Sequence, residues 1–535
     1  MKHILIILLL INAFILNAKE IDLNWINKQP KSIAKDFYIW RYLNQNITPI
    51  QSLKAVEQVK YLNKKIFYRF VDKYKDNSFI EYKSCMKMNT KDLIKQNDYC
   101  IESGLSIFDA TKLSKEELNF TIKKIENNYP ELNNKLSVLN SIEPFNHLKE
   151  SDIDIFFNVF NECGGKYRVE NLNYFFTSDL IKKLRNDKRF KQTIKLIVTN
   201  NKMDKSQLSL LNIDDKGFDF KTTFYLAINA IKQNKKNIAL KYLNSSYKKA
   251  YYQMDKDNVL FWQYLLTNEK KYLIDLSKSW DINIYSLYAS EILNKKQNNI
   301  IFYIEQEKGI KSSFNIKNPF EWLNILEESR KINSTKLKKY RSLFKTNETL
   351  GHLAFIKERY YKYKKSYFIT PYENFIGDLD IDRKSLIYAI ARQESRFIPT
   401  SISSAYAMGS MQIMPFLSKA ISKSLKEDYD IDKQLEPKTN LKYANFQLDF
   451  LERRLKHPLL ISYGYNGGIG FTKRVLKNGL FKKNRYEPFL SMELIPYEET
   501  KKYGKKVLAN YFVYYNYLNK NKKIKLKSLF ETINN

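Results

Sequence analysis

Residues 384–415 read KSLIYAIARQESRFIPTSISSAYAMGSMQIMP. The part before Glu394 contains no Gly or Pro, and Asp382 is placed to cap its N-terminus, so a helix is predicted there. Leu386 and Ile390 lie on the same stripe of that helix as Glu394. We therefore expect Glu394 at the C-terminal end of a helix, on the face that the apolar residues bury.

The position expected for Glu394 favours a protonated carboxyl group. Burial removes water from the carboxylate, and the negative end of the helix dipole lies nearby, so both effects raise its pKa. A Glu that stays protonated near neutral pH can give its proton to a leaving oxygen. The alternative is a Glu at a frayed helix end that points to solvent. The Ser, Gly, Gln and Met segment that follows can build a polar wall and favours the first interpretation.

The composition is that of a large, basic and helical protein. The chain has 535 residues, too many for one core, so about two to four domains are expected. Only 14 Gly and 12 Pro are present, which favours long helices over a turn-rich β architecture. The formal net charge is +34, but the Lys residues are spread along the whole chain and no nucleic-acid-binding motif is found. A nucleic-acid partner is therefore not expected.

Residues 1–18 are predicted to be a signal peptide. A positive start is followed by an apolar run from Ile4 to Leu16 and by a small-residue cleavage site that ends at Ala18. The apolar run is too short for a stable membrane span, and no Cys follows Ala18 to carry a lipid. We expect export to the periplasm, with an uncleaved anchor as the minority alternative.

The cysteines and histidines give weaker signals. In an oxidising compartment Cys85 and Cys100 could form a disulfide and leave Cys163 buried or free, although the spacing does not determine the pairing. The four His residues are scattered and form no ligand pair at helical spacing, so no metal site is expected. Nothing in the sequence indicates a cofactor.

The rest of the chain shows one helical pattern after another. Phe224 and Ile228 belong to one apolar stripe and Tyr242 to the next, with a polar turn predicted at Gln233–Asn237 between them. Short helix hairpins in series predict an α-superhelix over residues 19–305. The other two predicted regions are a small helical linker domain, 306–367, and a C-terminal domain, 368–535. The fold class is therefore mainly all-α.

Three motifs in the C-terminal region resemble the signature of the soluble lytic transglycosylases. In that family a Glu-Ser pair is followed at fixed spacing by a Ser, a Gly-Ala-x-Gly turn and Met-Gln-x-Met-Pro. Tyr465-Asn466 looks like the second motif, Tyr-Asn-Ala-Gly, and the segment from Ile495 to Tyr503 resembles the third, Ile-Pro-Phe-x-Glu-Thr-Arg-x-Tyr. The residues that match the first motif are Glu394, Ser395, Ser403, Ala407, Gly409, Met411, Gln412, Met414 and Pro415.

The resemblance implies an N-terminal, ring-like superhelix that is followed in the sequence by a lysozyme-like catalytic domain with a single catalytic acid. In the family this Glu protonates the glycosidic oxygen, the substrate's N-acetyl group stabilises the cationic centre, and the Glu then deprotonates the sugar's 6-hydroxyl. Glu394 is the matching residue here. The substrate-binding residues that the resemblance implies are Ser395, Ser403, Gln412, Met414, Tyr465, Asn466 and Glu499. Ser403 could instead cap a turn, Gln412 could satisfy backbone groups, and Glu499 could form an ordinary ion pair with a Lys.

Four positions depart from the family pattern. The family usually has Gly at Tyr406, Leu at Ser410, Ala at Gly467 and Arg at Lys501. Tyr406 puts a bulky side chain where a tight turn is expected, and we expect it to narrow a sugar subsite or to stack on a sugar ring. Lys501 keeps the positive charge but loses the forked donor geometry of Arg.

The predicted function is non-hydrolytic cleavage of the MurNAc-β-1,4-GlcNAc bond of peptidoglycan, giving 1,6-anhydro-MurNAc ends. A ring that threads the end of a glycan strand favours exolytic action by a monomer, and other cell-wall enzymes are candidate partners. The first alternative is a hydrolytic muramidase, which would need a second carboxylate such as Glu498 or Asp380 in a productive place. The second is a non-catalytic scaffold that binds glycan.

Overall fold

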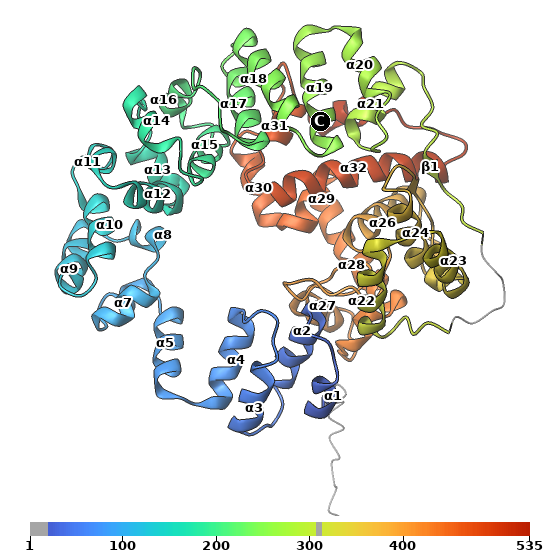
Figure 1. Cartoon of the computed structure of the whole chain (residues 1–535), viewed down its shortest axis with the longest axis horizontal. Coiled ribbons are helices and arrows are strands. Elements are labelled where there is room, and N and C mark those ends of the chain that lie inside the picture. Colours follow the sequence, from blue (N-terminus) through green and yellow to red (C-terminus); the bar gives the residue numbers. More distant parts are fainter. Residues whose placement is uncertain (1–19, 306–312, 535) are drawn as a thin grey trace, which may run out of the picture.

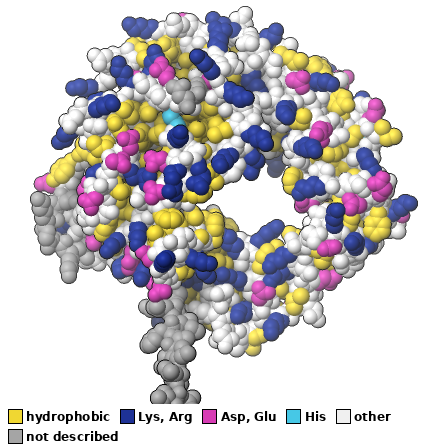
Figure 2. All heavy atoms as spheres, turned by 180° about the vertical axis from the view of Figure 1, so that it is seen from behind, with side chains coloured by type: hydrophobic (Ala, Val, Ile, Leu, Met, Phe, Trp, Pro, Cys, Tyr) yellow, Lys and Arg dark blue, Asp and Glu magenta, His cyan; other side chains and the backbone are white. Residues whose placement is uncertain are grey.

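The computed structural model describes residues 20–305 and 313–534, so the predicted signal peptide lies outside the described residues. The chain forms a ring of helices around a central opening, and the C-terminal helices fill one side of that ring (Figure 1). Seen from behind, Lys and Arg side chains border the opening (Figure 2). The predicted mainly α-helical fold with an N-terminal superhelix is confirmed. None of the helices described is long and apolar enough to cross a membrane.

The superhelix consists of short helices that pack on their neighbours along the chain. They are α1 (Leu23–Asn27), α2 (Ile33–Tyr42), α3 (Pro49–Val56), α4 (Lys64–Tyr74), α5 (Asn77–Lys87), α6 (Thr90–Leu93), α7 (Asp98–Gly104), α8 (Ile107–Ala110), α9 (Lys115–Ile125), α10 (Pro130–Asn140), α11 (Pro144–Glu150), α12 (Ile153–Glu162), α13 (Gly165–Asn171), α14 (Ser178–Leu184), α15 (Phe190–Val198), α16 (Asp204–Ser209), α17 (Phe220–Lys232), α18 (Lys236–Lys249), α19 (Gln253–Thr267), α20 (Lys270–Leu276) and α21 (Ile284–Ile292).

The hairpin of α17 and α18 shows how the sequence builds this array. Asp219 caps α17 by accepting a hydrogen bond from the Thr222 N–H, and the predicted stripe of Phe224 and Ile228 is buried. The turn is shorter than predicted: α17 ends at Lys232 and α18 already begins at Lys236. The polar residues from Lys236 onward are part of α18, which begins without the side-chain cap that a sequence pattern could have revealed.

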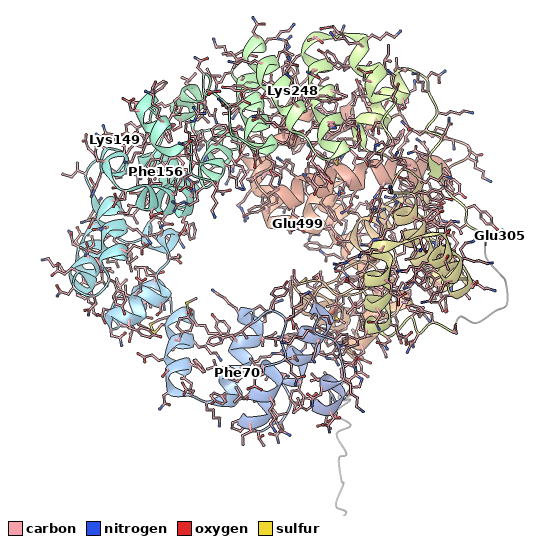
Figure 3. The ribbon with its side chains drawn as sticks, in the orientation of Figure 1. Phe70, Lys149, Phe156, Lys248, Glu305 and Glu499 are labelled. Atoms are coloured by element: carbon pink, nitrogen blue, oxygen red, sulfur yellow. A yellow bond between two sulfur atoms is a disulfide. The ribbon has the colours of Figure 1, made fainter. Side chains whose placement is uncertain are left out.

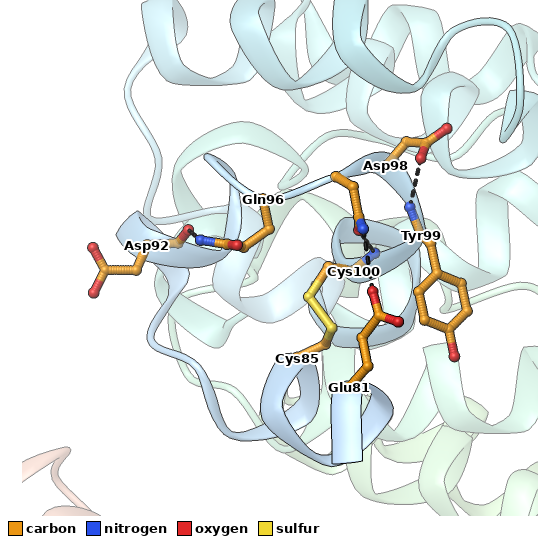
Figure 4. The surroundings of a disulfide bond; sticks show 8 residues. Glu81, Cys85, Asp92, Gln96, Asp98, Tyr99 and Cys100 are labelled. Atoms are coloured by element: carbon orange, nitrogen blue, oxygen red, sulfur yellow. Dashed lines mark hydrogen bonds between the residues drawn. A yellow bond between two sulfur atoms is a disulfide. The ribbon is translucent and has the colours of Figure 1, made fainter. Parts of the chain in front are cut away.

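A disulfide joins Cys85 on α5 to Cys100 on α7 (Figure 4). It closes a loop that contains the short helix α6. Cys163 is a buried free thiol. The bond therefore ties two consecutive helices of the superhelix together, at the part of the ring that lies far from the C-terminal helices (Figure 1).

A short parallel strand pair encloses the segment between the superhelix and the C-terminal helices. Ile300 of β1 is paired with Ser366 of β2, and Ile301 with Tyr367. The elements here are β1 (Ile300–Ile301), α22 (Pro319–Glu328), η1 (Ser329–Lys331), α23 (Ser334–Leu343), η2 (Asn347–Thr349), α24 (Leu350–Tyr360) and β2 (Ser366–Tyr367).

The C-terminal region is a compact helical unit in which α26 packs along the long helix α32. Helices α28 and α29 pack on each other and against this pair. The elements are α25 (Glu373–Ile376), α26 (Ile381–Glu394), α27 (Pro415–Ser424), η3 (Asp432–Leu435), α28 (Pro437–Leu455), α29 (Pro458–Gly467), α30 (Ile469–Lys477), α31 (Phe489–Leu494), α32 (Glu498–Leu518), α33 (Leu526–Glu531) and η4 (Thr532–Asn534).

Tyr406 closes the ring, and the expectation that it lines a sugar subsite is wrong. Its side chain is only 1 % exposed and contacts Phe37 and Trp40 of α2, with ring centroids 5.7 and 5.4 Å away. Asn63, before α4, donates a hydrogen bond to its hydroxyl at 2.8 Å. The bulky residue at this turn, whose φ is +70°, is therefore an anchor for the N-terminal helices.

The ring has a second junction, between α32 and the superhelix. The buried Lys501 ammonium pairs with Glu498 at 2.7 Å and donates to the Tyr225 hydroxyl of α17 at 3.0 Å. One turn further, Lys505 pairs at 2.5 Å with the buried Glu493 of the short helix before α32, and Glu493 accepts a hydrogen bond from the Tyr285 hydroxyl of α21 at 3.2 Å. Charges this deeply buried are tolerated because each is paired and hydrogen-bonded.

Candidate active site

Glu394 is the last residue of α26, as the sequence predicted, but the cap at the other end differs. Asp380, not Asp382, caps the helix, since its side chain accepts from the Arg383 N–H at 2.8 Å. Asp382 already lies in the first helical turn, and its carboxylate instead accepts a hydrogen bond from the Tyr511 hydroxyl at 2.7 Å. The helix therefore starts one residue after Asp380 and holds Glu394 against α32.

Glu394 is half-buried, and its carboxyl group contacts α32. Tyr503 of α32 donates a hydrogen bond to its Oε1 at 2.8 Å. Burial raises the pKa of Glu394 to about 7; the Tyr503 hydrogen bond opposes this rise, and the charge of Glu499 adds to it. At neutral pH the group is thus poised between acid and base. Tyr503 was quoted as part of the third motif but not predicted as a site residue; its place in that motif was the available signal.

Ser395 fixes the turn that follows the acid. Its hydroxyl donates to the Ser410 carbonyl at 2.8 Å, which ties the end of α26 to the second half of the first motif. The next two residues, Arg396 and Phe397, both have positive φ, at +57° and +66°. Ser395 therefore holds the backbone rather than presenting its hydroxyl to a ligand.

Ser403 and Gln412 hold the loop of the first motif together. The Ser403 hydroxyl accepts from the Ala407 N–H at 2.9 Å. The Gln412 amide donates to the carbonyls of Ser401 and Gly409 at 3.0 and 2.8 Å. Both residues make the structural contacts that were the alternatives to sugar binding. The Gln412 amide oxygen makes no described contact of this kind, and it is the part of this residue that a ligand can use.

Gly409 and Met414 explain the shape of this loop. Gly409 has φ +83°, and a Cβ there would meet the Gln434 carbonyl at 2.3 Å and the Asn440 side chain at 2.4 Å, so only Gly fits. Met414 is half-buried at the start of α27, whereas Met411 is fully buried. Met414 is thus the methionine that can reach a ligand, and Met411 is a core residue.

The second and third motifs meet at the start of α32. Tyr465 donates to the Met411 carbonyl at 2.8 Å, which links α29 to the loop of the first motif. Asn466 accepts from the Thr500 hydroxyl at 2.7 Å and donates to Glu499 at 3.3 Å. Thr500 was not predicted as a site residue. Asn466 therefore positions Glu499, as well as the loop in which it lies.

Glu499 is exposed and lies at the inner edge of the ring, facing the opening (Figure 3). Within the described residues no Lys or Arg forms an ion pair with it. A solvated carboxylate close enough to raise the pKa of Glu394 is available to a ligand that enters from the opening.

The two carboxylates that a hydrolase could use are engaged elsewhere. Burial alone would raise the pKa of Glu498, but the Lys501 ammonium overrides this effect and lowers it to about 2. Asp380 caps the opposite end of the 14-residue helix α26, about 20 Å from Glu394 at the rise of an α-helix. No group of His, Cys, Asp and Glu in the described part of the chain could hold a metal ion.

Comparison with known proteins identifies the unit that carries this site. Residues 379–487 match the family described as the transglycosylase SLT domain. The match includes Glu394 and the first two motifs, but not Glu499 and Tyr503 of α32. The resemblance to soluble lytic transglycosylases, stated above from the three motifs, is confirmed.

Curated relatives are similar over the same region. The chain is 29% identical over 205 residues to the soluble lytic murein transglycosylase of Escherichia coli (strain K12), covering 37% of this chain and 31% of that protein. The protein of the same name from Salmonella typhimurium is 30% identical over 202 residues, covering 36% and 30%. The chain thus matches about a third of the length of these relatives. The lytic transglycosylase Slt of Pseudomonas aeruginosa shares the fold, with a TM-score of 0.51, 14% identity and coverage of 93% and 89%.

Proposed function

We propose that this chain is a lytic transglycosylase that cleaves the MurNAc-β-1,4-GlcNAc bond of peptidoglycan without water. The observation that carries the proposal is Glu394, a single carboxyl group whose pKa of about 7 lets it act as an acid and then as a base. The match of residues 379–487 to the transglycosylase SLT domain family supports the same chemistry.

In the proposed reaction the protonated Glu394 gives its proton to the glycosidic oxygen as the C1–O bond of MurNAc breaks. The carbonyl oxygen of the N-acetyl group of that sugar bonds to C1 and stabilises the positive charge. The Glu394 carboxylate then takes the proton of the 6-hydroxyl, whose oxygen attacks C1 and releases the N-acetyl oxygen. The product is a 1,6-anhydro ring, and Glu394 is protonated again. Tyr503 keeps the carboxyl group oriented through both steps.

The hydrolytic alternative is less well supported because it needs a second carboxylate that activates water. Glu498 is held in its ion pair with Lys501, and Asp380 lies at the far end of α26. A non-catalytic scaffold that only binds glycan would have no use for a Glu394 whose pKa is raised, so the raised pKa argues against this alternative.

The deciding experiment is mass spectrometry of the products after the chain digests purified peptidoglycan in H₂¹⁸O. We expect products that end in 1,6-anhydro-muramic acid and carry no ¹⁸O, and none from Glu394→Gln. Glu131→Gln, which changes an exposed Glu on α10, is the matched control and is expected to cut normally. Products that gain ¹⁸O would establish the hydrolase, and no products from any variant would favour the scaffold.

We also propose that the chain acts in the periplasm, as a monomer that starts at strand ends. The disulfide between Cys85 and Cys100 supports an oxidising compartment. The opening bordered by Glu499 supports threading of a strand end (Figure 3). Digestion of end-labelled glycan strands tests the last point: exolytic action releases single disaccharide units from the start, whereas endolytic action first shortens the strands.

A further inference from the structure

A hollow of about 600 Å³ lies between the superhelix and the C-terminal region, next to the end of α26. Residues before and at the start of α19 and α21 line it, together with residues near the ends of α24 and α26 and one stripe of α32. Gln393, the neighbour of Glu394, and Lys502, the neighbour of Tyr503, both line it. The hollow is therefore separate from the groups that surround Glu394, yet only one residue away from them on two helices.

Three aromatic side chains in this hollow face solvent. Tyr252, Trp280 and Tyr363 line it and are 65%, 38% and 45% exposed. Tyr252 is held in place by an edge-to-face contact with Tyr251, with centroids 5.1 Å apart. Exposed aromatic groups that gather at one concave place mark a binding surface rather than a core. The C–H faces of sugar rings stack on such side chains.

The hollow also carries a surplus of positive charge. Five Lys and Arg side chains line it against three carboxylates, a surplus of two. Arg392 and Arg396 share the single buried carboxylate of Glu358, at 2.9 and 3.2 Å. No carboxylate of the described residues forms an ion pair with Lys506, whose side chain is exposed. Lys506 is thus free to pair with a carboxylate from outside, and the two positive charges of Arg392 and Arg396 exceed the single negative charge of Glu358.

We propose that this hollow binds a carboxylate-bearing stretch of a glycan strand, beside and distinct from the place of cleavage. The inference rests on the proposed function, since it takes its ligand class from that substrate. Sugar rings stack on Trp280 and Tyr252, while a carboxylate faces Lys506 and Arg396. That carboxylate comes either from the lactyl group of a bare strand or from a peptide attached to it.

The test is sedimentation of the full chain with insoluble peptidoglycan, in the Glu394→Gln background so that nothing is cut. Trp280→Ala and Lys506→Glu are each expected to raise the protein concentration for half-saturation about fivefold or more, the usual effect of truncating a binding hot spot. Two matched controls are expected to change it less than about twofold. They are Phe120→Ala on α9, 52% exposed but outside the lining, and Lys149→Glu on the outer rim (Figure 3).

Two further arms separate the possible outcomes. Stripping the peptides from peptidoglycan frees lactyl carboxylates that are amide-linked in the intact polymer. A loss with Lys506→Glu on the stripped polymer alone therefore identifies the lactyl group, a loss on the intact polymer alone identifies the peptide, and a loss on both shows that the hollow accepts either carboxylate. If Trp280→Ala and Lys506→Glu both keep the half-saturation concentration and the melting temperature of the parent, the inference is overturned. This holds even if the chain with Glu394 intact cleaves peptidoglycan. If Trp280→Ala and Lys506→Glu weaken binding but the chain with Glu394 intact releases no products, the glycan-binding role of the hollow is supported and the proposed reaction is refuted.

Discussion

The pH dependence of the reaction is expected to respond in opposite directions to changes at Tyr503 and Glu499. The Tyr503 hydroxyl donates to Glu394 at 2.8 Å and so stabilises the carboxylate, which lowers the pKa of Glu394. The negative charge of Glu499 has the reverse effect and raises it. Tyr503→Phe should therefore move the pKa of Glu394 up from about 7, and Glu499→Gln should move it down.

The hydrogen bond gives the larger of the two effects. A hydrogen bond to a charged group contributes about 1.5–3 kcal/mol, and a pKa change of one corresponds to about 1.4 kcal/mol. We expect Tyr503→Phe to move the alkaline limb of the rate profile up by about 1 pH unit, because the protonated acid also keeps part of the hydrogen bond. Glu499 is exposed, so water screens its charge, and Glu499→Gln should move the limb down by about 0.5 pH unit or less.

The assay is the initial rate of release of 1,6-anhydro products at low substrate, measured from pH 4 to 9. Under that condition the alkaline limb reports the pKa of the free enzyme's essential acid. Lys149→Gln on the outer rim is the control and should leave the limb in place. An alkaline limb that moves in the same direction in both variants, or in neither, would refute the assignment of Glu394 as the proton donor.

Three other predictions concern stability. The pKa of Glu394 is raised in the folded chain from its ordinary value of 4.5 to about 7, so the folded state loses stability as the pH rises through that range. Glu394→Gln should therefore increase the free energy of unfolding by about 2–3 kcal/mol at pH 8 and change it little at pH 4. Urea unfolding at the two pH values measures this difference. Tyr406→Ala should remove about 3–5 kcal/mol of packing at the ring closure, seen as faster hydrogen exchange in α2 and α4, whereas unchanged exchange there would contradict the anchoring role. Replacing Cys85 and Cys100 by Ala should cost about 3 kcal/mol for the 15-residue separation, and reduction with dithiothreitol should lower the melting temperature of the parent to that of the variant.

The sequence predicted what depends on neighbours along the chain. The stripe of α26 and the motif segments follow local rules, so the end of the helix at Glu394 and the region of the site were predicted from them. The contacts of Tyr406 were not predictable in this way, because Phe37 and Trp40 lie more than 300 residues earlier and no local pattern pairs them. The N-cap was misplaced for a different reason: Asp380 and Asp382 both suit a cap, and only the extended backbone at Asp380 shows which one is used.

Helix α32 joins the acid to the ring. Its first turns present Glu499 and Tyr503 to Glu394. On the same turns Lys501 donates to the Tyr225 hydroxyl of the superhelix, and Lys505 pairs with Glu493 of α31, which accepts from the Tyr285 hydroxyl of the superhelix. The ion-pair partners Glu498 and Glu493 lie on α32 and α31, so moving the superhelix away would leave these pairs intact. It would remove the buried hydrogen bonds to the Tyr225 and Tyr285 hydroxyls, at a cost of about 1–3 kcal/mol each. The superhelix therefore does more than surround the substrate: its contact with α32 holds two of the groups that set the protonation of the acid.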